Sequence, residues 1–400
     1  MKTTNKLAFY GGDPVRNKPY KCFINPRQLT PEFDEEDIVR VKGILDSGNL
    51  SGFIANASDS FYGGPHVIEL EKLFENYFEA EHAISVNSCT SGLHAAIASL
   101  KLEEGAEVIV PSLTVSMSAA AIKAAGAVPT LADVDVETHC LSGASIERAI
   151  TSRTKAVMVV HLFGRAANMD EILQVCKKHK LYLIEDCAQA PGAIYNNQKV
   201  GTFGDIGVFS FNQNKVITCG EGGMIITNND RFAKRCELIR NHGEAMTQEF
   251  SDADFSEVVG FNYRMNEIEA YLSSSQFKKL DRLNSKRIEL ANYLINQLSE
   301  INFIKTPNVI DQFSNVVFQL PILLNCENLK SAQLCKALGA EGIPFSPCIK
   351  PLYELPMFNH YKEEDFPNTR LLKSCLVLTK ICHNNNVDLS DIDHAVQALH

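Results

Sequence analysis

Two polar segments of this sequence contain residues suited to amine chemistry. Lys215 ends the segment 210–215 (Ser-Phe-Asn-Gln-Asn-Lys) and precedes the glycine-rich turn 220–223. Asp186 lies two residues after the apolar run 181–184. A lysine amine, a carboxylate at a strand end and nearby hydroxyls are the protein groups that pyridoxal phosphate needs. The sequence therefore predicts an enzyme whose cofactor is pyridoxal 5'-phosphate.

Asp186 is the candidate partner of the cofactor's ring nitrogen. The cofactor withdraws electrons only while that nitrogen keeps a proton, and a carboxylate in a dry site keeps the proton there. The run 181–184 predicts a strand, so Asp186 is expected at the carboxyl end, where open parallel sheets bind ligands. Gln189, in the same turn, is expected to reach the ring's phenolic oxygen. Taken alone, Asp186 is more often explained as a turn or capping residue.

The segment 87–92 (Asn-Ser-Cys-Thr-Ser-Gly) is the candidate phosphate site. A phosphate needs backbone N–H groups at a helix start together with hydroxyl donors, and Ser210 supplies a further hydroxyl. Taken alone, Ser88 or Thr90 is more often a simple helix N-cap, and Lys215 an exposed turn lysine. The occurrence of all three segments in this order favours the cofactor site.

The composition is that of an ordinary soluble globular protein. The chain has 400 residues, 45% of them hydrophobic, and a formal net charge of -10 with acids and bases mixed along it. Two domains are expected at this length, and nucleic acid is not an expected partner. The apolar run 7–12 is too short for a signal peptide and no later run suits a membrane span, so we expect a cytoplasmic location without membrane contact. The 12 cysteines are scattered, without CxxC pairs, which predicts free thiols and no metal site.

Helical and extended patterns alternate between residues 67 and 227. We predict strands at 82–86, 107–111, 128–134, 154–162, 181–185, 206–211 and 223–227, and helices at 32–47, 67–78, 91–100, 117–125 and 170–180. Such alternation indicates an α/β fold with a largely parallel sheet between helices. The glycine- and serine-rich stretch 49–65 is expected to be a loop that lines a site.

A long helical pattern then runs from Met265 to Leu298. Such a helix would connect a large domain, residues 1–264 with its N-terminal segment, to a smaller α/β domain, residues 265–400. Within the latter we predict strands at 316–323 and near Ile343, a helix at 329–338 and a final helix opened by Asp388 or Ser390.

Four motifs together resemble one enzyme family. They are Asn87–His94 (NSCTSGLH), Glu185–Ala190 (EDCAQA), Ser210–Lys215 with Gly220–Gly223, and Gly260–Met265 (GFNYRM). In this order and spacing they resemble the DegT/DnrJ/EryC1/StrS family of sugar aminotransferases, over nearly the whole chain. The opening segment 7–16 resembles some members as well.

The resemblance implies a fold-type-I pyridoxal-phosphate transferase, with a mostly parallel sheet of the seven-stranded type in its large domain. It also implies that Lys215 bonds covalently to the cofactor, Asp186 pairs with the pyridine nitrogen and Gln189 touches the phenolic oxygen. The residues implied to hold the phosphate are Thr90, Ser91, Ser210 and, from a partner subunit, Asn262. The expected active unit is therefore a homodimer with two shared sites.

The sequence departs from the family pattern at three points. Members usually place an aromatic residue over the cofactor ring after a Pro-x-x-Thr run, whereas Thr114 is followed here by Val115. Packing against the ring is then aliphatic, or another side chain serves. Many members have histidine where this chain has Asn212, which leaves the substrate-facing contact open. Because there is no tryptophan, any stacking must use Phe or Tyr.

Several other residues allow two interpretations. His161 and His242 either line the site or are structural histidines. Arg264 either binds a carboxylate of the amino donor, as its forked guanidinium suits, or forms a salt bridge at a dimer interface. Cys187 and Cys219 are expected to be packing residues, since no histidine stands near them in the sequence.

These observations predict an aminotransferase that moves an amino group from L-glutamate or L-glutamine to a keto sugar, most simply a nucleotide-linked one. A keto-inositol or a free keto-sugar acid is an alternative acceptor. A sugar dehydratase of the same family would carry histidine in place of Lys215. A sugar-binding or regulatory relative is the non-enzymatic alternative. The sugar, the aminated carbon, the nucleotide and the pathway are set by loops whose contacts residue types do not reveal.

Overall fold

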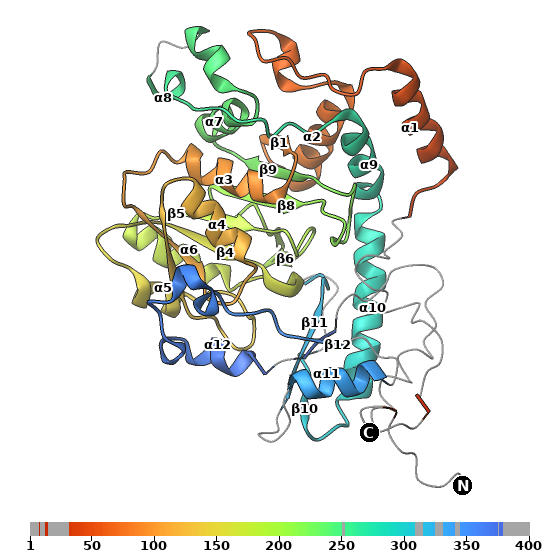
Figure 1. Cartoon of the computed structure of the whole chain (residues 1–400), viewed down its shortest axis with the longest axis vertical. Helices are drawn as coiled ribbons and strands as arrows, with labels where there is room; N and C mark the ends of the chain where they lie inside the picture. The colour runs from red at the N-terminus through yellow and green to blue at the C-terminus, as the bar shows by residue number, and fades with distance from the viewer. Residues whose placement is uncertain are drawn as a thin grey trace.

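The computed structural model is an α/β structure built around a seven-stranded sheet (Figure 1). It describes residues 8, 13–14, 32–249, 253–308, 315–324, 331–340, 345–374 and 376–378. The strands of the large sheet are β1 (His82–Val86), β2 (Glu107–Pro111), β3 (Val128–Ala132), β4 (Thr154–Val160), β5 (Tyr182–Asp186), β8 (Ile206–Ser210) and β9 (Gly223–Thr227). All seven were predicted from the sequence, with bounds that agree within two residues.

The strands lie in the order β1-β9-β8-β5-β4-β2-β3. The pairs from β8 through β5, β4 and β2 to β3 are parallel, whereas β9 is antiparallel to both of its neighbours. Six strands therefore point one way, and their carboxyl ends share one edge. The mostly parallel sheet that was predicted is confirmed, and the reversed β9 is a feature that the alternation of patterns did not reveal.

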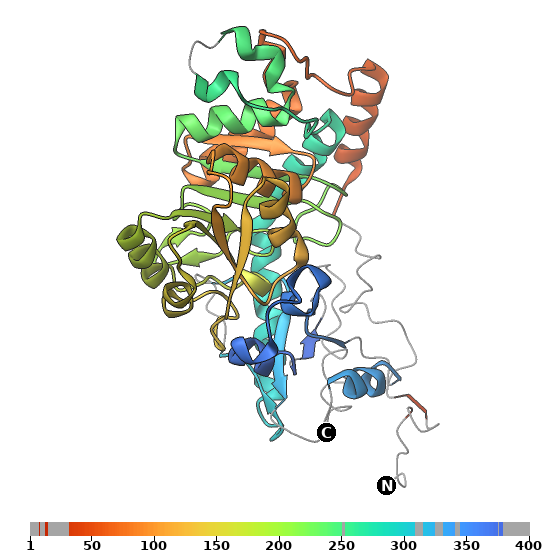
Figure 2. The same ribbon diagram turned by 60° about the vertical axis from the view of Figure 1, so that its left-hand side comes forward.

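Helices cover both faces of this sheet (Figures 1 and 2). The helices of residues 35–256 are α1 (Glu35–Ser47), α2 (Pro65–Phe78), α3 (Cys89–Ser99), α4 (Ser116–Ala124), α5 (Gly143–Ala149), α6 (Met169–His179), α7 (Asp230–Arg240) and α8 (Ala253–Ser256). Alternate residues of each strand serve the two faces: Val208 packs with α3, α4 and α7, whereas Phe209 packs with α2. On that second face, α5 and α6 cover β4 and the strands near it. This two-sided burial explains the continuous apolar runs.

The long helix predicted for 265–298 is two helices. α9 (Glu267–Phe277) and α10 (Leu280–Leu298) are separated at Lys278 and Lys279. Both residues keep helical backbone angles, so the pattern of apolar residues continues across the break and conceals it. α9 packs on α2 through Phe277, whose ring stacks on Phe74 at 4.0 Å.

α10 leads to a second, four-stranded antiparallel sheet in the order β10-β11-β13-β12 (Figure 1). Its elements are β10 (Ile304–Lys305), β11 (Leu320–Leu324), β12 (Phe345–Pro347) and β13 (Leu376–Leu378), with α11 (Ser331–Ala340). β11 begins four residues later than predicted, because the residues before it bond to the turn after β4 instead. The division of the chain at 264/265 stays a prediction.

Several elements, most of them short, were not predicted from the sequence. Among the described residues they are α5, α7, α8, the hairpin β6–β7 (Ile194–Tyr195, Gln198–Lys199), β10, β13, α12 (Pro367–Leu372) and the 3-10 helices η3 (Asp59–Tyr62), η4 (Leu162–Gly164), η5 (Gly243–Glu249), η6 (Leu352–Glu354), η7 (Pro356–Phe358) and η8 (Glu363–Asp365). Most span too few residues for a periodic pattern. The strand predicted near Ile343 corresponds to β12, which begins two residues later. The final helix predicted at 388 or 390 lies outside the described residues, as does most of the opening segment 7–16.

Candidate active site

The motif segments meet at the carboxyl edge of the large sheet. Gly223, the first residue of β9, pairs with Val86 at the end of β1 and with Ser210 at the end of β8. Asp186 ends β5, which pairs with β8. The reversed strand therefore brings the turn 87–92 beside Ser210, and the parallel strands bring Asp186 to the same edge.

Asp186 is a buried carboxylate with two donors. The side chain is 5% exposed; the Ser118 hydroxyl donates to Oδ2 (2.9 Å) and the Ala188 N–H donates to Oδ1 (3.1 Å). Burial raises the pKa of Asp186, while these donors and the charge of Lys215 act in the opposite direction. The two donors hold the carboxylate in one orientation, in which it can share a proton with a bound group.

Lys215 sits in a tight turn after β8. Its N–H donates to the Asn212 carbonyl (2.8 Å), and the Asn212 side chain donates to Glu221 Oε1 (2.9 Å) across the turn. Lys215 is half-buried. Burial lowers the pKa of Lys215, and the charge of Asp186 opposes that shift. A lowered pKa enlarges the fraction of the amine that is unprotonated, which favours its use as a base.

The turn 87–92 opens helix α3. Ser88 is the N-cap and accepts from the Ser91 N–H (3.1 Å), and the Ser91 hydroxyl donates to Asn87 Oδ1 (2.5 Å). Thr90, the second helical residue, is exposed. The helix-capping interpretation of Ser88 is thus correct, and it leaves the N–H groups and hydroxyls at the start of an 11-residue helix facing the site edge.

Gly223 and Ser210 complete this edge. A Cβ added at Gly223 would lie 2.7 Å from the Cys89 nitrogen, so only glycine lets β9 approach the turn this closely. Ser210 is buried, and its hydroxyl oxygen accepts from the Asn212 N–H (3.3 Å), which leaves the hydroxyl proton to donate elsewhere.

Gln189 is held by the turn after β4. The Phe163 N–H donates to Gln189 Oε1 (2.8 Å), which leaves the amide NH2 of this buried side chain as its donor group. Val115 is half-buried at the N-cap position of α4. Its place next to the Ser118-bearing helix agrees with an aliphatic contact to a bound ring.

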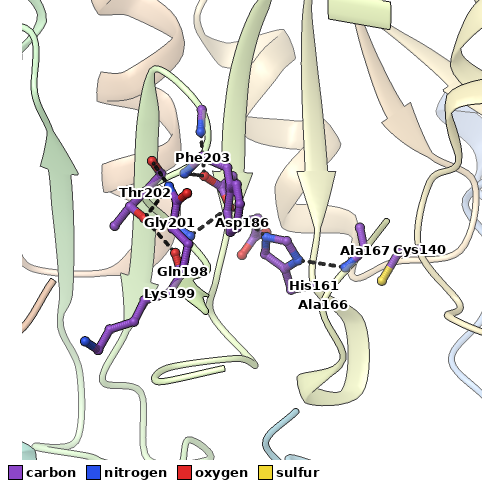
Figure 3. A network of polar contacts seen from close by, with 12 residues as sticks. Cys140, His161, Ala166, Ala167, Asp186, Gln198, Lys199, Gly201, Thr202 and Phe203 are labelled. Carbon is purple, nitrogen blue, oxygen red and sulfur yellow. Dashed lines mark hydrogen bonds and ion pairs between the residues drawn. The ribbon is translucent and has the colours of Figure 1, made fainter. Parts of the chain in front are cut away.

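His161 belongs to a closed network behind the site (Figure 3). Its Nδ1 accepts from the Ala167 N–H (3.2 Å), so Nε2 carries the proton and donates to Glu185 (3.0 Å). Glu185 also accepts from the N–H groups of Gly201, Phe203 and Gly204, each at 2.7 Å. Both side chains are fully buried, and these bonds favour the structural interpretation of His161.

The segment 260–265 lies beside the phosphate turn of its own chain. The Asn87 side chain donates to the Asn262 carbonyl (3.3 Å), and Arg264 Nε donates to Asn262 Oδ1 (2.9 Å). Arg264 also donates to Asn241 Oδ1 (3.4 Å). No carboxylate among the described residues pairs with Arg264, so neither interpretation of this arginine is decided. His242 is half-exposed and lies near Glu244 (3.4 Å).

The environment of three cysteines near the site disfavours their thiolate forms. Burial raises the pKa of Cys89 and Cys187, and it raises the pKa of Cys219 to about 12. Thiols of raised pKa stay protonated and react slowly. The raised pKa values agree with the expectation that Cys187 and Cys219 are packing residues.

Two residues of this site were missed by the sequence analysis. Ser118 donates to Asp186, and Phe318 places its ring 4.7 Å from Lys215 Nζ. A serine inside a helix and a phenylalanine far along the chain carry no local signal. Only the folded chain brings them to the sheet edge.

A family model of the DegT/DnrJ/EryC1/StrS aminotransferases matches residues 53–400. The chain belongs to this family. The resemblance seen in the four motifs is therefore confirmed, and with it the fold class and the prediction of a pyridoxal-phosphate-dependent sugar aminotransferase.

Named relatives of this DegT/DnrJ/EryC1/StrS member include sugar and inosose aminotransferases. GDP-perosamine synthase of Caulobacter vibrioides is 36% identical over 360 residues, covering 88% of this chain and 95% of that protein. L-glutamine:2-deoxy-scyllo-inosose aminotransferase of Streptomyces kanamyceticus is 32% identical over 368 residues, covering 89% and 83%. The crystal structure of S. venezuelae DesV in complex with a ketimine intermediate superposes with a TM-score of 0.82 at 27% identity, covering 96% and 98%.

The side chains at the sheet edge fit the cofactor of this family. A buried carboxylate fixed by two donors suits a protonated ring nitrogen, and a capped helix start with hydroxyls suits a phosphate. The half-buried amine of Lys215 lies near enough to Asp186 for their charges to interact. Among the described helices, none has the length and apolar character to cross a membrane.

Proposed function

We propose that this aminotransferase moves an amino group from L-glutamate or L-glutamine to a nucleotide-linked keto sugar, in surface-polysaccharide or amino-sugar biosynthesis in the cytoplasm. The observation that carries the proposal is the grouping of Lys215 and Asp186 at the sheet edge, beside the capped turn of α3. The likeness to GDP-perosamine synthase supports a nucleotide-linked acceptor. The likeness to the inosose enzyme supports L-glutamine as donor and makes a keto-inositol the second candidate acceptor.

Each proposed residue has one task. When bound, pyridoxal phosphate supplies the electron sink that stabilises negative charge at the donor's Cα. Asp186 keeps the proton on the ring nitrogen, and the Gln189 amide donates to the phenolic oxygen. Lys215 anchors the cofactor and, once displaced by the donor amine, takes the proton from Cα and delivers it to the C4' carbon.

The remaining residues bind and orient. Thr90 and Ser210 donate hydroxyl protons to the phosphate, and Ser91 does so by exchanging its bond to Asn87 for one to the phosphate. The N–H groups at the start of α3 assist them. Val115 covers the ring with an aliphatic side chain and helps to exclude water.

A homodimer with shared sites completes the proposal. Asn262 is exposed, and its neighbours Val259 and Phe261 are 71% and 39% exposed, so this segment forms a partly apolar surface beside the turn 87–92. Such a surface suits burial against a second copy, which places Asn262 at the phosphate of the partner's site.

The test is Lys215→Ala. The variant is expected to fold and to retain cofactor binding through the phosphate and Asp186, but to lose transamination, measured as release of 2-oxoglutarate with a panel of nucleotide-linked keto sugars and keto-inositols. The control is Lys72→Ala, an exposed lysine on α2 that pairs with Glu75 and should leave the rate unchanged. Turnover by Lys215→Ala at the wild-type rate would refute the assignment.

A further inference from the structure

The ring of Phe318, which lies next to the second sheet in the chain, faces the amine of Lys215. Lys215 Nζ lies 4.7 Å from the centre of the Phe318 ring, within the range of a cation–π contact. Phe318 is 6% exposed and lies two residues before the start of β11. No other described ring makes such a contact with Lys215.

Phe318 is fixed on both sides of its backbone. Its N–H donates to the Phe163 carbonyl (3.0 Å), and its carbonyl accepts from Arg287 Nη2 (2.8 Å). Arg287 is a buried residue of α10 that also donates to the Val317 carbonyl (2.6 Å). These bonds fix the backbone that carries the ring between α10, β11 and the turn after β4.

The turn that holds Phe318 is itself built for close approach. Phe163 and Gly164 have positive φ angles of 61° and 93°. A Cβ at Gly164 would lie 2.4 Å from the Val316 carbonyl oxygen. Because Phe163 also donates to Gln189, the cofactor-facing residues Gln189 and Lys215 are linked through Phe163 and Phe318.

Asp186 of β5 is the charged group that acts on Lys215: it favours the charged amine, and burial opposes it. The thiol of Cys89, at the start of α3, lies near the amine but is uncharged, because burial raises its pKa. An aromatic face adds attraction for the ammonium without adding a charge that would compete for it.

We propose that Phe318 is a positioning residue for Lys215: its ring face holds the lysine amine in the site whenever that amine is free. The inference rests on the proposed role of Lys215 in transamination. Family members usually place an aromatic residue over the cofactor ring, whereas this chain has Val115 at that position. Phe318 gives the lysine an aromatic contact. The ring restricts the lysine side chain and stabilises its protonated form, so that the amine returns a proton from a fixed place.

The test measures the pKa of Lys215 in the free protein, without cofactor or substrate. Competitive amine labelling at a series of pH values, read for the Lys215 peptide by mass spectrometry, gives that pKa directly. Phe318→Leu is expected to lower it by about 0.5 to 1 unit, because the cation–π attraction is lost while an apolar side chain stays. Phe318→Tyr keeps the ring and is expected to keep the pKa.

The matched control is Phe345→Leu, the same substitution at a residue that is also 6% exposed but lies in β12 and contacts other side chains. It should lower thermal stability without changing the pKa of Lys215. If Phe318→Leu does not fold, site-specific fluorinated phenylalanines at 318 keep the ring shape and weaken its negative face, and the pKa should fall stepwise with fluorine number.

An unchanged pKa of Lys215 in Phe318→Leu or across the fluorinated series would overturn the inference. Because no cofactor takes part, this outcome is distinct from a failure of the proposed function, which is read from 2-oxoglutarate release by the wild-type enzyme.

Discussion

A buried ion pair beneath the loop 49–64 gives the most sharply defined prediction. Arg240, 1% exposed at the end of α7, donates to Glu71 Oε1 (2.6 Å) on α2. Glu71 also accepts from the N–H and hydroxyl of Ser85 in β1. The guanidinium lies 4.8 Å from the Phe53 ring centre, so one side chain ties the loop, α2 and β1 together.

Arg240→Met removes the counter-charge and leaves Glu71 buried. Breaking a buried pair from one side costs about 3 to 5 kcal/mol, because the other charge is left uncompensated. For a chain of 400 residues, an unfolding entropy of about 2.1 cal/mol/K per residue converts this cost to a fall in Tm of roughly 4 to 6 °C. Lysine at 240 would keep the charge but lose the forked geometry.

The pH dependence of this stability loss follows from the direction in which the pKa of Glu71 is shifted. Burial already raises the pKa of Glu71, and Arg240 opposes that rise. Without Arg240 the folded-state pKa lies further above the unfolded value, so the folded variant binds a proton more tightly. Its stability relative to the wild type is greatest below the unfolded pKa and falls as pH rises through the folded pKa. The loss in Tm should therefore be smaller at pH 5 than at pH 8.

Thermal unfolding followed by far-UV circular dichroism measures these shifts, since the chain has no tryptophan for fluorescence. The double variant Glu71→Gln/Arg240→Met removes both charges and keeps an acceptor for Ser85, so it should be more stable than Arg240→Met alone. A Tm loss under about 1 °C, or one that is larger at pH 5 than at pH 8, would refute the reasoning.

Two further substitutions test the site and the link between the sheets. Ser118→Ala removes a donor that lowers the pKa of Asp186, so the acidic limb of the kcat/KM–pH profile should move to higher pH. Ser116→Ala, two residues earlier, should not move it, and an unmoved limb in Ser118→Ala counts against the role of Asp186. Gly164→Ala places a Cβ at a φ of 93° and 2.4 Å from the Val316 carbonyl oxygen, so the free energy of unfolding should fall by about 2 to 4 kcal/mol. Gly339→Ala in α11, with nothing within 4 Å, should be neutral or slightly stabilising in the same thermal assay.

The sequence predicted the parallel sheet and the residues of its carboxyl edge for a physical reason. Runs such as 156–160 are apolar on every residue because helices cover both faces, and Asp186 and Ser210 stand where those runs end. The position of these residues in the pattern and their chemistry therefore both predicted a site at the carboxyl edge of the sheet. The motifs are also contiguous in sequence, so no tertiary knowledge was needed to find them.

Other features depend on contacts that no local pattern records. The direction of β9 follows from the turn after β8, at whose end Gly223 closely approaches Cys89, and the break at Lys278 and Lys279 keeps helical backbone angles. Phe318 reaches Lys215 across about a hundred positions of chain, and only the bonds of Phe163 and Arg287 place it there. Whether Lys215 is fully or partly buried likewise depends on packing, not on its neighbours in sequence.

The visible absorption spectrum of the purified wild-type protein with pyridoxal phosphate, recorded before and after addition of L-glutamate or L-glutamine, tests the central claim most directly. The proposal predicts a visible cofactor band in the wild type that is replaced, on addition of the donor, by the shorter-wavelength band of the aminated cofactor, with release of the matching 2-oxo acid. A protein that acquires no cofactor band, or a band that neither donor changes, would contradict it.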